Sequence, residues 1–298
     1  MKLIAKGNTA EIYEYGDNLI CKLFYPQYPT EYIEHEFHNA TTAWKLGIRT
    51  PKAHKIIIEG ERQGIIYDQI VGEVLSIKFS NSSEPVYDEW MDRFVNFHKQ
   101  LMQYNIDDAI SYKDFLKMFA TDEETIAKIN ALADGNCFIH GDFHLENVML
   151  DENNNVVLID MMNVCKGTEL YDVARTYFLL RYDKNIQSKY MKKMGYSVED
   201  IIPYLDVILM IRENEMKRYE EINKKMFDCV GVYDNMLVTV TACGECCTGC
   251  PKKEKGICRE FPCEKLTSVI HWNPDIVDHL KKLVLHYFAE QKGDHKAI

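Results

Sequence analysis

The sequence lacks the long apolar runs, the excess of positive charge and the repeats that mark several classes of protein. No segment approaches the ~20 consecutive apolar residues of a membrane-spanning helix. The opening residues, MKLIAKGNTAEIY, turn polar too early for a secretory signal, and this favours a cytoplasmic protein. A formal net charge of −11 argues against nucleic-acid binding, which needs a basic surface. Internal repeats, low-complexity tracts and flexible linkers are also missing, so an ordinary globular chain is expected.

The 298 residues exceed one ordinary core of ~100–150 residues, so more than one lobe is expected. Five short strand-like segments and one helix predict a small α+β lobe over residues 1–72. Helical periodicity then dominates residues 73–235. The composition changes again where six cysteines crowd together, and we expect a third, cysteine-rich module over residues 236–298.

Several helix ends are marked by local signals. Residues 31–46 have helical character and stop at Gly47, with Pro51 following soon after. Two residue pairs have the spacing of a capping box, in which two side chains close the start of a helix: Thr121 with Glu124, and Ser197 with Asp200.

The most polar stretch between apolar segments is IHGDFHLENVML at 139–150, followed by the strand-like VVLID at 156–160. Phosphoryl transfer from a nucleotide needs a carboxylate that orients the attacking hydroxyl and oxygen ligands that hold Mg²⁺ against the phosphates. Asp142 and Asn147 have the five-residue separation of base and metal ligand in the protein-kinase loop HRDxxxxN. Asp160 ends the next apolar strand, where a second metal carboxylate is expected. Taken singly, Asp142 and Asn147 are also ordinary turn residues.

The motif HGDxHxxN, followed by a hydrophobic-Ile-Asp strand, resembles the aminoglycoside phosphotransferase and choline kinase family, small-molecule relatives of protein kinases. The resemblance implies a bilobal, protein-kinase-like α+β fold with a β-rich N-lobe and a helical C-lobe. It also implies that Asp142 is the catalytic base and that Asn147 and Asp160 are Mg²⁺ ligands. His140 and His144 would brace the loop.

Two downstream features bear on the support of this loop. GTELYDVARTY is similar to the family's Asp-Leu-Ala helix start, which makes Asp172 a residue expected behind the loop. The second acid that is typical after Ile-Asp in the family is missing, because Met161, Met162 and Asn163 follow Asp160.

The N-terminal stretch KGNTAEIYEYGDNLICKLF resembles the family's phosphate-covering hairpin and the strand with its lysine. By this resemblance Lys22 reaches the nucleotide phosphates and Glu36 is its ion-pair partner. Glu34 is the reserve choice, because residues two apart cannot share a helix face. Without the resemblance, Lys22 would read as a solvated strand residue. The other expected contacts of ATP or GTP come from a phosphate loop at residues 7–10 and a hinge at residues 67–70: Gly7, Asn8, Thr9, Ala10, Tyr67, Asp68, Gln69 and Ile70.

The resemblance as a whole implies a kinase that phosphorylates a hydroxyl of an aminoglycoside-, amine- or sugar-like molecule. Four acids in RENEMKRYEEINKK would suit a cationic acceptor: Glu213, Glu215, Glu220 and Glu221. They also fit a solvated face on which acids pair with lysines four residues away. Two other functions stay open: a protein kinase, although no APE-like segment follows Asp160, and a nucleotide- and metal-binding regulatory protein without catalysis.

The cysteine-rich segment TACGECCTGCPKKEKGICREFPCEKL predicts a bound metal ion, because thiolates at short spacings can converge on one ion. We expect structural zinc on Cys243, Cys246, Cys250 and Cys258, with Cys247 and Cys263 as alternates. An iron–sulfur cluster is the second choice, since Pro251 follows a cysteine but the full ferredoxin spacing is absent. Reduced thiols, or disulfides formed on isolation, are the alternative to a metal site.

Overall fold

The computed structural model describes residues 1–7, 9–26, 28–80, 83–223, 229–233 and 236–240. Side chains are described up to residue 212 and at 214, except at 84 and 85. The chain forms two compact units, Met1–Ile211 and Arg212–Ile298. Every site residue whose side chain the structure describes belongs to the first unit. The division expected from the sequence, at 72/73 and 235/236, stays a prediction.

The N-terminal part of the first unit is a five-stranded antiparallel sheet with the strand order β1-β2-β3-β5-β4. Its strands are β1 (Leu3–Lys6), β2 (Ala10–Glu14), β3 (Leu19–Phe24), β4 (Ala53–Glu59) and β5 (Arg62–Asp68). The turn between β2 and β3 contains Gly16 and Asn18, both with positive φ, as tight hairpin turns require. The five strands expected from alternating apolar residues are therefore present.

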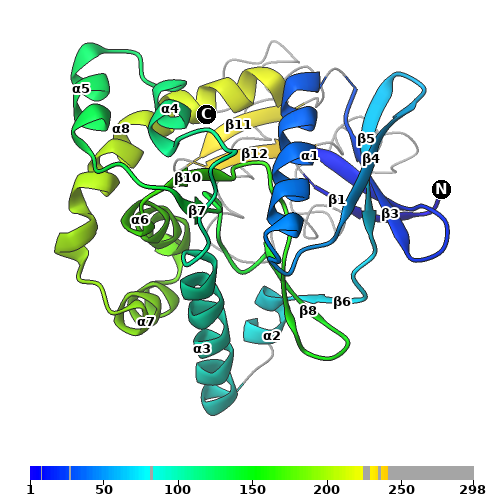
Figure 1. Ribbon diagram of the computed structural model, residues 1–298, viewed down its shortest axis with the longest axis horizontal. Helices are drawn as coiled ribbons and strands as arrows, with labels where there is room; N and C mark the ends of the chain where they lie inside the picture. The colour runs from blue at the N-terminus through cyan, green and yellow to red at the C-terminus, as the bar shows by residue number, and fades with distance from the viewer. Residues whose placement is uncertain (8, 27, 81–82, 224–228, 234–235, 241–298) are drawn as a thin grey trace, which may run out of the picture. The chain divides into compact units, whose positions relative to one another are not determined.

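Helix α1 (Thr30–Lys45) packs against β4 and β5 (Figure 1). Its buried positions recur at helical spacing and form one face: Ile33, Glu36, Asn39, Ala40 and Ala43. Gly47 follows the helix with φ +83°, a conformation that glycine adopts without the penalty of a Cβ. The predicted helix and its end are confirmed. The buried face is unusual because two of its five residues are polar, and both contribute to the site.

The rest of the first unit is mainly helical, with short strands between the helices. The helices are α2 (Leu75–Ser80), α3 (Glu84–Leu101), α4 (Tyr112–Lys117), α5 (Glu123–Ala131), α6 (Glu169–Leu179), the 3₁₀ turn Leu180–Tyr182, α7 (Lys184–Met194) and α8 (Val198–Asn223), which continues into the second unit. Strand β6 (Gly72–Val74) pairs with β8 (Val148–Asp151), β8 with β9 (Val156–Leu158), and β7 (Cys137–Ile139) with β10 (Cys165–Gly167). In the second unit, β11 (Cys229–Tyr233) pairs with β12 (Met236–Val240). This confirms the expected α+β class, with a β-rich N-terminal part before a helical part.

One predicted capping box is confirmed and the other is wrong by one residue. The Ser197 hydroxyl donates to the Asp200 carboxylate at 2.8 Å, and the Asp200 N–H donates back to Ser197 Oγ at 3.3 Å. Helix α5 begins at Glu123 instead, and Asp122 accepts from the Thr125 N–H at 2.7 Å. A carboxylate caps the free N–H groups with a full negative charge, which favours Asp122 over the threonine before it.

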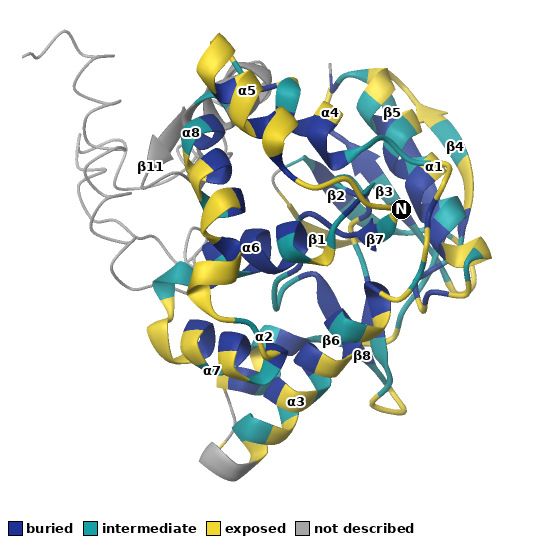
Figure 2. Ribbon diagram, turned by 60° about the vertical axis from the view of Figure 1, so that its left-hand side comes forward, coloured by how far each residue is buried: buried dark blue, intermediate teal, exposed yellow. Residues whose placement is uncertain are grey.

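The helical core packs directly behind the polar loop at 139–150. Figure 2 shows that α3 and α7 turn buried faces inward and exposed faces outward, whereas α6 is buried over most of its length. Phe94 on α3 stacks on Phe143 of the loop with ring centroids 4.6 Å apart, and both rings are fully buried. Burying two aromatic side chains contributes several kcal/mol, on the order of 2 to 3 each, so this contact anchors the loop to the core. No helix in the described part of the chain has both the length and the apolar character needed to cross a membrane.

Candidate active site

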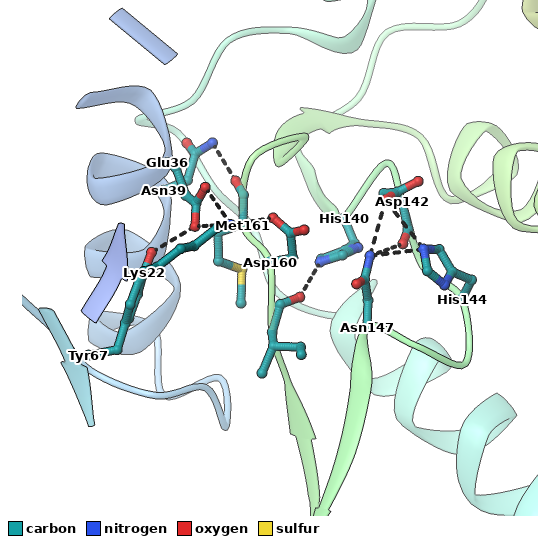
Figure 3. Close-up of polar contacts among 11 residues, drawn as sticks. Lys22, Glu36, Asn39, Tyr67, His140, Asp142, His144, Asn147, Asp160 and Met161 are labelled. Carbon is teal, nitrogen blue, oxygen red and sulfur yellow. Dashed lines mark hydrogen bonds and ion pairs between the residues drawn. The ribbon is translucent and has the colours of Figure 1, made fainter. Parts of the chain in front are cut away.

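A buried ion pair joins β3 to α1. Alternation along β3 places Lys22 on the face opposite Cys21 and Leu23, which belong to a hydrophobic cluster. The Lys22 ammonium therefore faces α1, where Nζ lies 2.7 and 2.8 Å from the two carboxylate oxygens of Glu36. The Tyr67 hydroxyl donates to the same carboxylate at 2.9 Å (Figure 3). Because the Glu36 side chain is only 1% exposed, this contact holds the lysine in one place.

Asp160 joins the same cluster from a distant part of the sequence. Lys22 Nζ lies 3.1 Å from Asp160 Oδ1, and the Asp160 side chain is 40% exposed. Burial alone would lower the pKa of Lys22, but the charges of Asp160 and Glu36 outweigh it and raise that pKa above its ordinary value. Lys22 is therefore a fixed cation between one buried and one exposed carboxylate. We call Lys22, Glu36, Tyr67 and Asp160 the front cluster.

Asp160 also has a strained backbone, with φ +64°. A residue other than glycine in the left-handed region costs roughly 1 kcal/mol or more and persists only where its surroundings enforce it. Strained backbone conformations are common at functional sites. Here the strained residue is Asp160, whose carboxylate is the exposed one of the front cluster.

The loop at 139–150 holds Asp142, His144 and Asn147 together. The Asn147 amide nitrogen donates to the backbone oxygen of Asp142 at 2.9 Å and to its carboxylate at 3.1 Å. The same nitrogen lies 3.1 Å from His144 Nε2, which in turn lies 3.4 Å from Asp142 Oδ2. In Figure 3, Asp160 lies between Lys22 and the loop residues His140 and Asn147.

The charge of His144 decides the protonation of Asp142. Burial alone would raise the pKa of Asp142, but the charge and hydrogen bond of His144 outweigh burial and leave that pKa below its usual range. The reciprocal effect of Asp142 raises the pKa of His144 above its ordinary value, against the opposing effect of burial. At neutral pH Asp142 is therefore an anion that accepts hydrogen bonds but is a weak base.

His140 supports the start of the loop. Its ring is fully buried, and Nε2 donates to the backbone oxygen of Ile159 at 3.2 Å. Burial lowers the pKa of His140, so the ring is neutral at pH 7 and has one proton to donate. The hydrogen bond ties the start of the loop to the residue before Asp160, which fits the bracing role expected from the sequence.

Behind the loop lies a second, fully buried polar cluster. The Asp172 carboxylate accepts from the backbone N–H of His140 at 3.0 Å and of Gly141 at 2.9 Å. It also accepts from His98 Nε2 at 3.0 Å, and the Tyr190 hydroxyl donates to His98 Nδ1 at 2.9 Å. We call His98, Asp172, Tyr190 and these two backbone N–H groups the rear cluster. It fixes the backbone just before Asp142, the position in which the sequence placed Asp172.

The predicted phosphate loop is the turn between β1 and β2. The Gly7 N–H donates to Ala10 O at 2.9 Å, and the Tyr25 hydroxyl donates to Gly7 O at 3.0 Å. The Tyr25 N–H donates to Thr9 O at 3.1 Å, while Asn8 lies outside the described residues. A Cβ on Gly7 would meet only Ala10 O, at an ordinary 3.5 Å, so this backbone does not require glycine. What marks this turn as a phosphate loop is therefore its position before the strand of Lys22.

The predicted hinge follows β5. The Asp68 N–H donates to Lys52 O at 3.0 Å, and the Gln69 N–H donates to Asn18 O at 2.8 Å. These two donors are engaged by the residues that precede β4 and β3, so they are not free for a base. If the segment holds adenine or guanine, the backbone donor among Asp68, Gln69 and Ile70 is the N–H of Ile70.

Asn147 and Asp160 have the chemistry of Mg²⁺ ligands. The Ile159 N–H donates to Asn147 O at 3.0 Å, so the two candidate ligands flank one backbone hydrogen bond. The amide nitrogen of Asn147 makes the contacts above, which leaves the amide oxygen for a metal. On Asp160, Lys22 contacts the carboxylate oxygen Oδ1 and leaves Oδ2 for a metal. Within the described residues no group of three or more His, Cys, Asp and Glu side chains could hold a metal ion by itself. Two protein oxygens nevertheless fit Mg²⁺, which usually completes its shell with phosphate oxygens and water.

Some predicted residues lie elsewhere or outside the described residues. Glu34 is exposed, so the structure selects Glu36 as the partner of Lys22. The candidate zinc ligands Cys243, Cys246, Cys250 and Cys258, the alternates Cys247 and Cys263, and the side chains of Glu213, Glu215, Glu220 and Glu221 lie outside the described residues.

Sequence reasoning missed two contacts of the site. Tyr67 was expected only as part of the hinge, yet it hydrogen-bonds Glu36. Asn39 was not singled out, although its amide contacts the turn that follows Asp160. A signal for Asn39 did exist, because it lies three residues after Glu36 and hence on the same helix face.

Comparison with known proteins agrees with this geometry. The sequence model of the phosphotransferase enzyme family matches residues 87–192, a stretch that contains Asp142, Asn147, Asp160 and Asp172. The match, together with the fold, confirms the predicted resemblance and the predicted enzyme class, a small-molecule kinase. No curated protein matches the sequence.

Solved structures with a similar fold include aminoglycoside phosphotransferases and a choline kinase. Aminoglycoside phosphotransferase APH(3'')-Id from Streptomyces rimosus is 12% identical, with 70% of this chain and 92% of that chain covered and a TM-score of 0.50. Choline kinase LicA from Streptococcus pneumoniae is 14% identical, with 74% and 86% covered and a TM-score of 0.53. A thermostable mutant of APH(4)-Ia is 12% identical, with 75% and 94% covered and a TM-score of 0.53. At these identities the likeness shows the fold, and the kinase-like architecture is confirmed.

Proposed function

We propose that this chain transfers the γ-phosphoryl group of ATP or GTP to a hydroxyl group of a small molecule. The observation that carries the proposal is the ion pair of Lys22 with both Glu36 and Asp160, formed across 138 residues of sequence between Lys22 and Asp160. It joins a phosphate-binding cation to a metal-binding carboxylate beside the loop of Asp142. Phosphoryl transfer needs this combination, because catalysis rests on positioning and charge neutralisation more than on covalent chemistry.

The nucleotide would bind with its phosphates at Lys22 and beneath the turn at Gly7–Ala10. Glu36 and Tyr67 keep the lysine side chain extended toward the phosphates, so little side-chain freedom is lost when they bind. The N–H of Ile70 would donate to the base. The solved structures with this fold support nucleotide use, since APH(3'')-Id was determined with ADP and streptomycin and APH(4)-Ia with ADP and hygromycin B.

Asn147 and Asp160 would hold Mg²⁺ through their side-chain oxygens. When bound there, Mg²⁺ neutralises the negative charge of the transferring phosphoryl group. The exposed Asp160 carboxylate suits this role, because it is held in position by Lys22 while much of its surface stays open to a ligand.

Asp142 would accept a hydrogen bond from the attacking hydroxyl. Because His144 holds the pKa of Asp142 low, the carboxylate is ionised at neutral pH and can accept this hydrogen bond. A weak base suits a loose transition state, in which the hydroxyl proton leaves late and the orientation of the oxygen matters most. Asn147 and His144 fix the carboxylate that does the orienting.

The acceptor is proposed to be an amine-bearing or sugar-like alcohol. The charge of −11 favours a cationic molecule by long-range attraction. The named ligands of the similar structures, streptomycin and hygromycin B, and the choline of the choline kinase set the classes to try first. Structural zinc on Cys243, Cys246, Cys250 and Cys258 stays a separate prediction from their spacing, to be checked by elemental analysis of the purified chain.

The test is a transfer assay with the full chain, Mg²⁺, and ATP or GTP, against aminoglycosides, choline-like amines and sugars. We expect one acceptor class to gain a phosphate, seen by ³¹P NMR. Asp142→Asn should lower this rate by about a thousandfold, within the range for a positioned base, while leaving nucleotide affinity close to wild type. Asp134→Asn is the control, because Asp134 is 91% exposed and forms its ion pair with Lys113 and not with a residue of the site. An Asp142→Asn enzyme that keeps most of its rate would refute the assignment.

A further inference from the structure

Asn39 links α1 to the turn that follows Asp160. Its side chain is completely buried, and Nδ2 donates to Met161 O at 3.0 Å and lies 3.3 Å from Val164 O. A third contact places the same nitrogen 3.1 Å from His35 Nε2, one helical turn earlier. Figure 3 shows Asn39 and Met161 beside the front cluster. The amide therefore reaches the residue directly after the strained Asp160.

The turn at 161–164 lies against the catalytic loop as well as against α1. A Cβ on Gly141 would come within 2.6 Å of Asn163 O, so the backbones of the loop and the turn are in close contact there. Met161 is 2% exposed, and its carbonyl also accepts from the Val164 N–H at 3.4 Å. The turn is thus held on one side by Gly141 and on the other by Asn39.

The two polar residues of the buried face of α1 have complementary contacts. Glu36 holds Lys22, and Asn39, three residues later, holds the peptide after Asp160. One rigid helix therefore sets both partners of the Lys22–Asp160 ion pair. The second acid expected after Asp160 is missing from this sequence, and Asn39 supports the turn in its place by binding backbone oxygens.

Packing alone does not explain an asparagine at this position. Its Oδ1 is buried without a hydrogen-bond partner among the described residues. A buried unpaired carbonyl is destabilising, and an apolar side chain of similar shape would avoid that cost. The donated hydrogen bonds to the turn are what the amide contributes.

We propose that Asn39 is a positioning residue that holds Asp160 in its strained, metal-binding conformation. The proposal rests on the proposed function, because it assigns Asp160 to Mg²⁺. It predicts that loss of the Asn39 amide weakens the Mg²⁺-dependent part of nucleotide binding and leaves the rest of the fold in place.

The experiment compares Asn39→Leu with Gln187→Leu in the full chain. Gln187 is the matched control, since it is a 5% exposed amide that donates to Tyr177 O at 2.8 Å on the helical side of the molecule. Calorimetry would give the ADP affinity with and without Mg²⁺. Turnover, where an acceptor is known, would give kcat, the acceptor KM and the Mg²⁺ concentration for half-maximal rate.

We expect Asn39→Leu to lose about tenfold of the Mg²⁺-dependent gain in ADP affinity, the effect of one or two net hydrogen bonds. The same variant should need about tenfold more Mg²⁺ and show a lower kcat with an unchanged acceptor KM. Gln187→Leu should lower stability without changing either Mg²⁺ value. If Asn39→Leu does not fold, Asn39→Ser removes the same donors and gives the same readout.

Three results would overturn the proposal: a wild-type Mg²⁺ dependence in Asn39→Leu, an equal change in Gln187→Leu, or an ADP affinity of the wild type that ignores Mg²⁺. Failure of the proposed function looks different. In that case the wild type binds MgADP, Asn39→Leu still loses the Mg²⁺ effect, and no acceptor is phosphorylated.

Discussion

The front cluster and the rear cluster are both built around a buried carboxylate, yet only the front cluster also has a carboxylate that is exposed to solvent. In the front cluster Glu36 is saturated by Lys22 and Tyr67, but Asp160 on the other side of Lys22 is 40% exposed. In the rear cluster His98 and Asp172 are both 0% exposed, and Asp172 accepts three hydrogen bonds from the chain itself.

This difference separates ligand binding from support. A cluster with a fixed cation and an exposed carboxylate can exchange protein contacts for phosphate and metal contacts. A cluster whose buried groups are all paired with the chain gains nothing from a ligand and instead makes the backbone rigid. Changes in the front cluster should therefore lower activity, and changes in the rear cluster should lower stability.

The largest expected effect is on activity, in Asp160→Asn. The variant loses a metal-binding carboxylate, and phosphoryl transfer should fall by about a thousandfold, equivalent to several kcal/mol of transition-state stabilisation. Because the side chain is partly exposed and Lys22 keeps Glu36, the urea unfolding midpoint should stay close to wild type. A large loss of stability with little loss of rate would reverse the roles of the two clusters.

The next largest effect is on stability, in Asp172→Asn. Removing the charged partner of a buried polar group costs roughly 3–5 kcal/mol, and the new amide would set an N–H against the N–H groups of the loop. Urea unfolding at pH 7 measures this loss, and Asp134→Asn serves again as the exposed control. An unchanged unfolding free energy would show that the rear cluster does not support the fold.

The same pair of proteins should show a pH dependence of known sign. Burial opposes ionisation of Asp172, but the hydrogen bonds that it accepts from His98 and from the Gly141 backbone outweigh burial and lower the pKa of Asp172 below its ordinary value. A lowered pKa gives stability that is present above the unfolded value of about 3.9 and is lost as the pH falls through the folded value. The difference between wild type and Asp172→Asn should therefore be constant from pH 7 to about 5 and shrink only below pH ~4.

Gly141→Ala should have a smaller effect that reaches both clusters. Gly141 has φ +74°, and a Cβ there would lie 2.6 Å from Asn163 O. We expect a loss of about 2 kcal/mol in stability and a slower transfer reaction, since the turn after Asp160 must move. Gly195→Ala is the matched control, because Gly195 has φ +87° but no atom within 4 Å of an added Cβ. Equal losses of stability in the two variants would mean that backbone strain alone causes them, and that the contact of residue 141 with the turn does not contribute.

The smallest expected effects come from removing one hydroxyl in each cluster. Tyr67→Phe deletes a donor to Glu36, and Tyr190→Phe deletes a donor to His98. Each should cost about 1 kcal/mol. Tyr67→Phe should also raise the KM for the nucleotide, whereas Tyr190→Phe should change only the melting temperature. The distinction fails if both variants alter KM equally.

The parts of the site that were predicted from the sequence are those set by local pattern. The helix over Thr30–Lys45 and the choice of Glu36 over Glu34 follow from helical spacing, because only one of two residues two apart can face the sheet. The order of Asp142, Asn147 and Asp160 follows from a loop and strand whose short-range spacing fixes their geometry.

The parts that were missed depend on contacts between residues distant in sequence, or on two neighbouring residues that could each cap the same helix. The partner of Asn39 lies 122 residues away, and no local pattern reports it. The backbone N–H groups of Asp68 and Gln69 looked available, but the carbonyl groups of Lys52 and Asn18, just before β4 and β3, accept from them. Thr121 and Asp122 compete to cap the same helix, and their order depends on how the chain enters that helix.

The most direct test of the central claim is calorimetric binding of ADP with Mg²⁺ to Asp160→Asn and Asp172→Asn, at a temperature where both are folded. If the front cluster binds the metal–nucleotide complex and the rear cluster supports the loop, Asp160→Asn should lose about tenfold or more in affinity. Asp172→Asn should bind MgADP nearly as well as the wild type. A wild-type affinity in Asp160→Asn, with the loss confined to Asp172→Asn, would contradict the account.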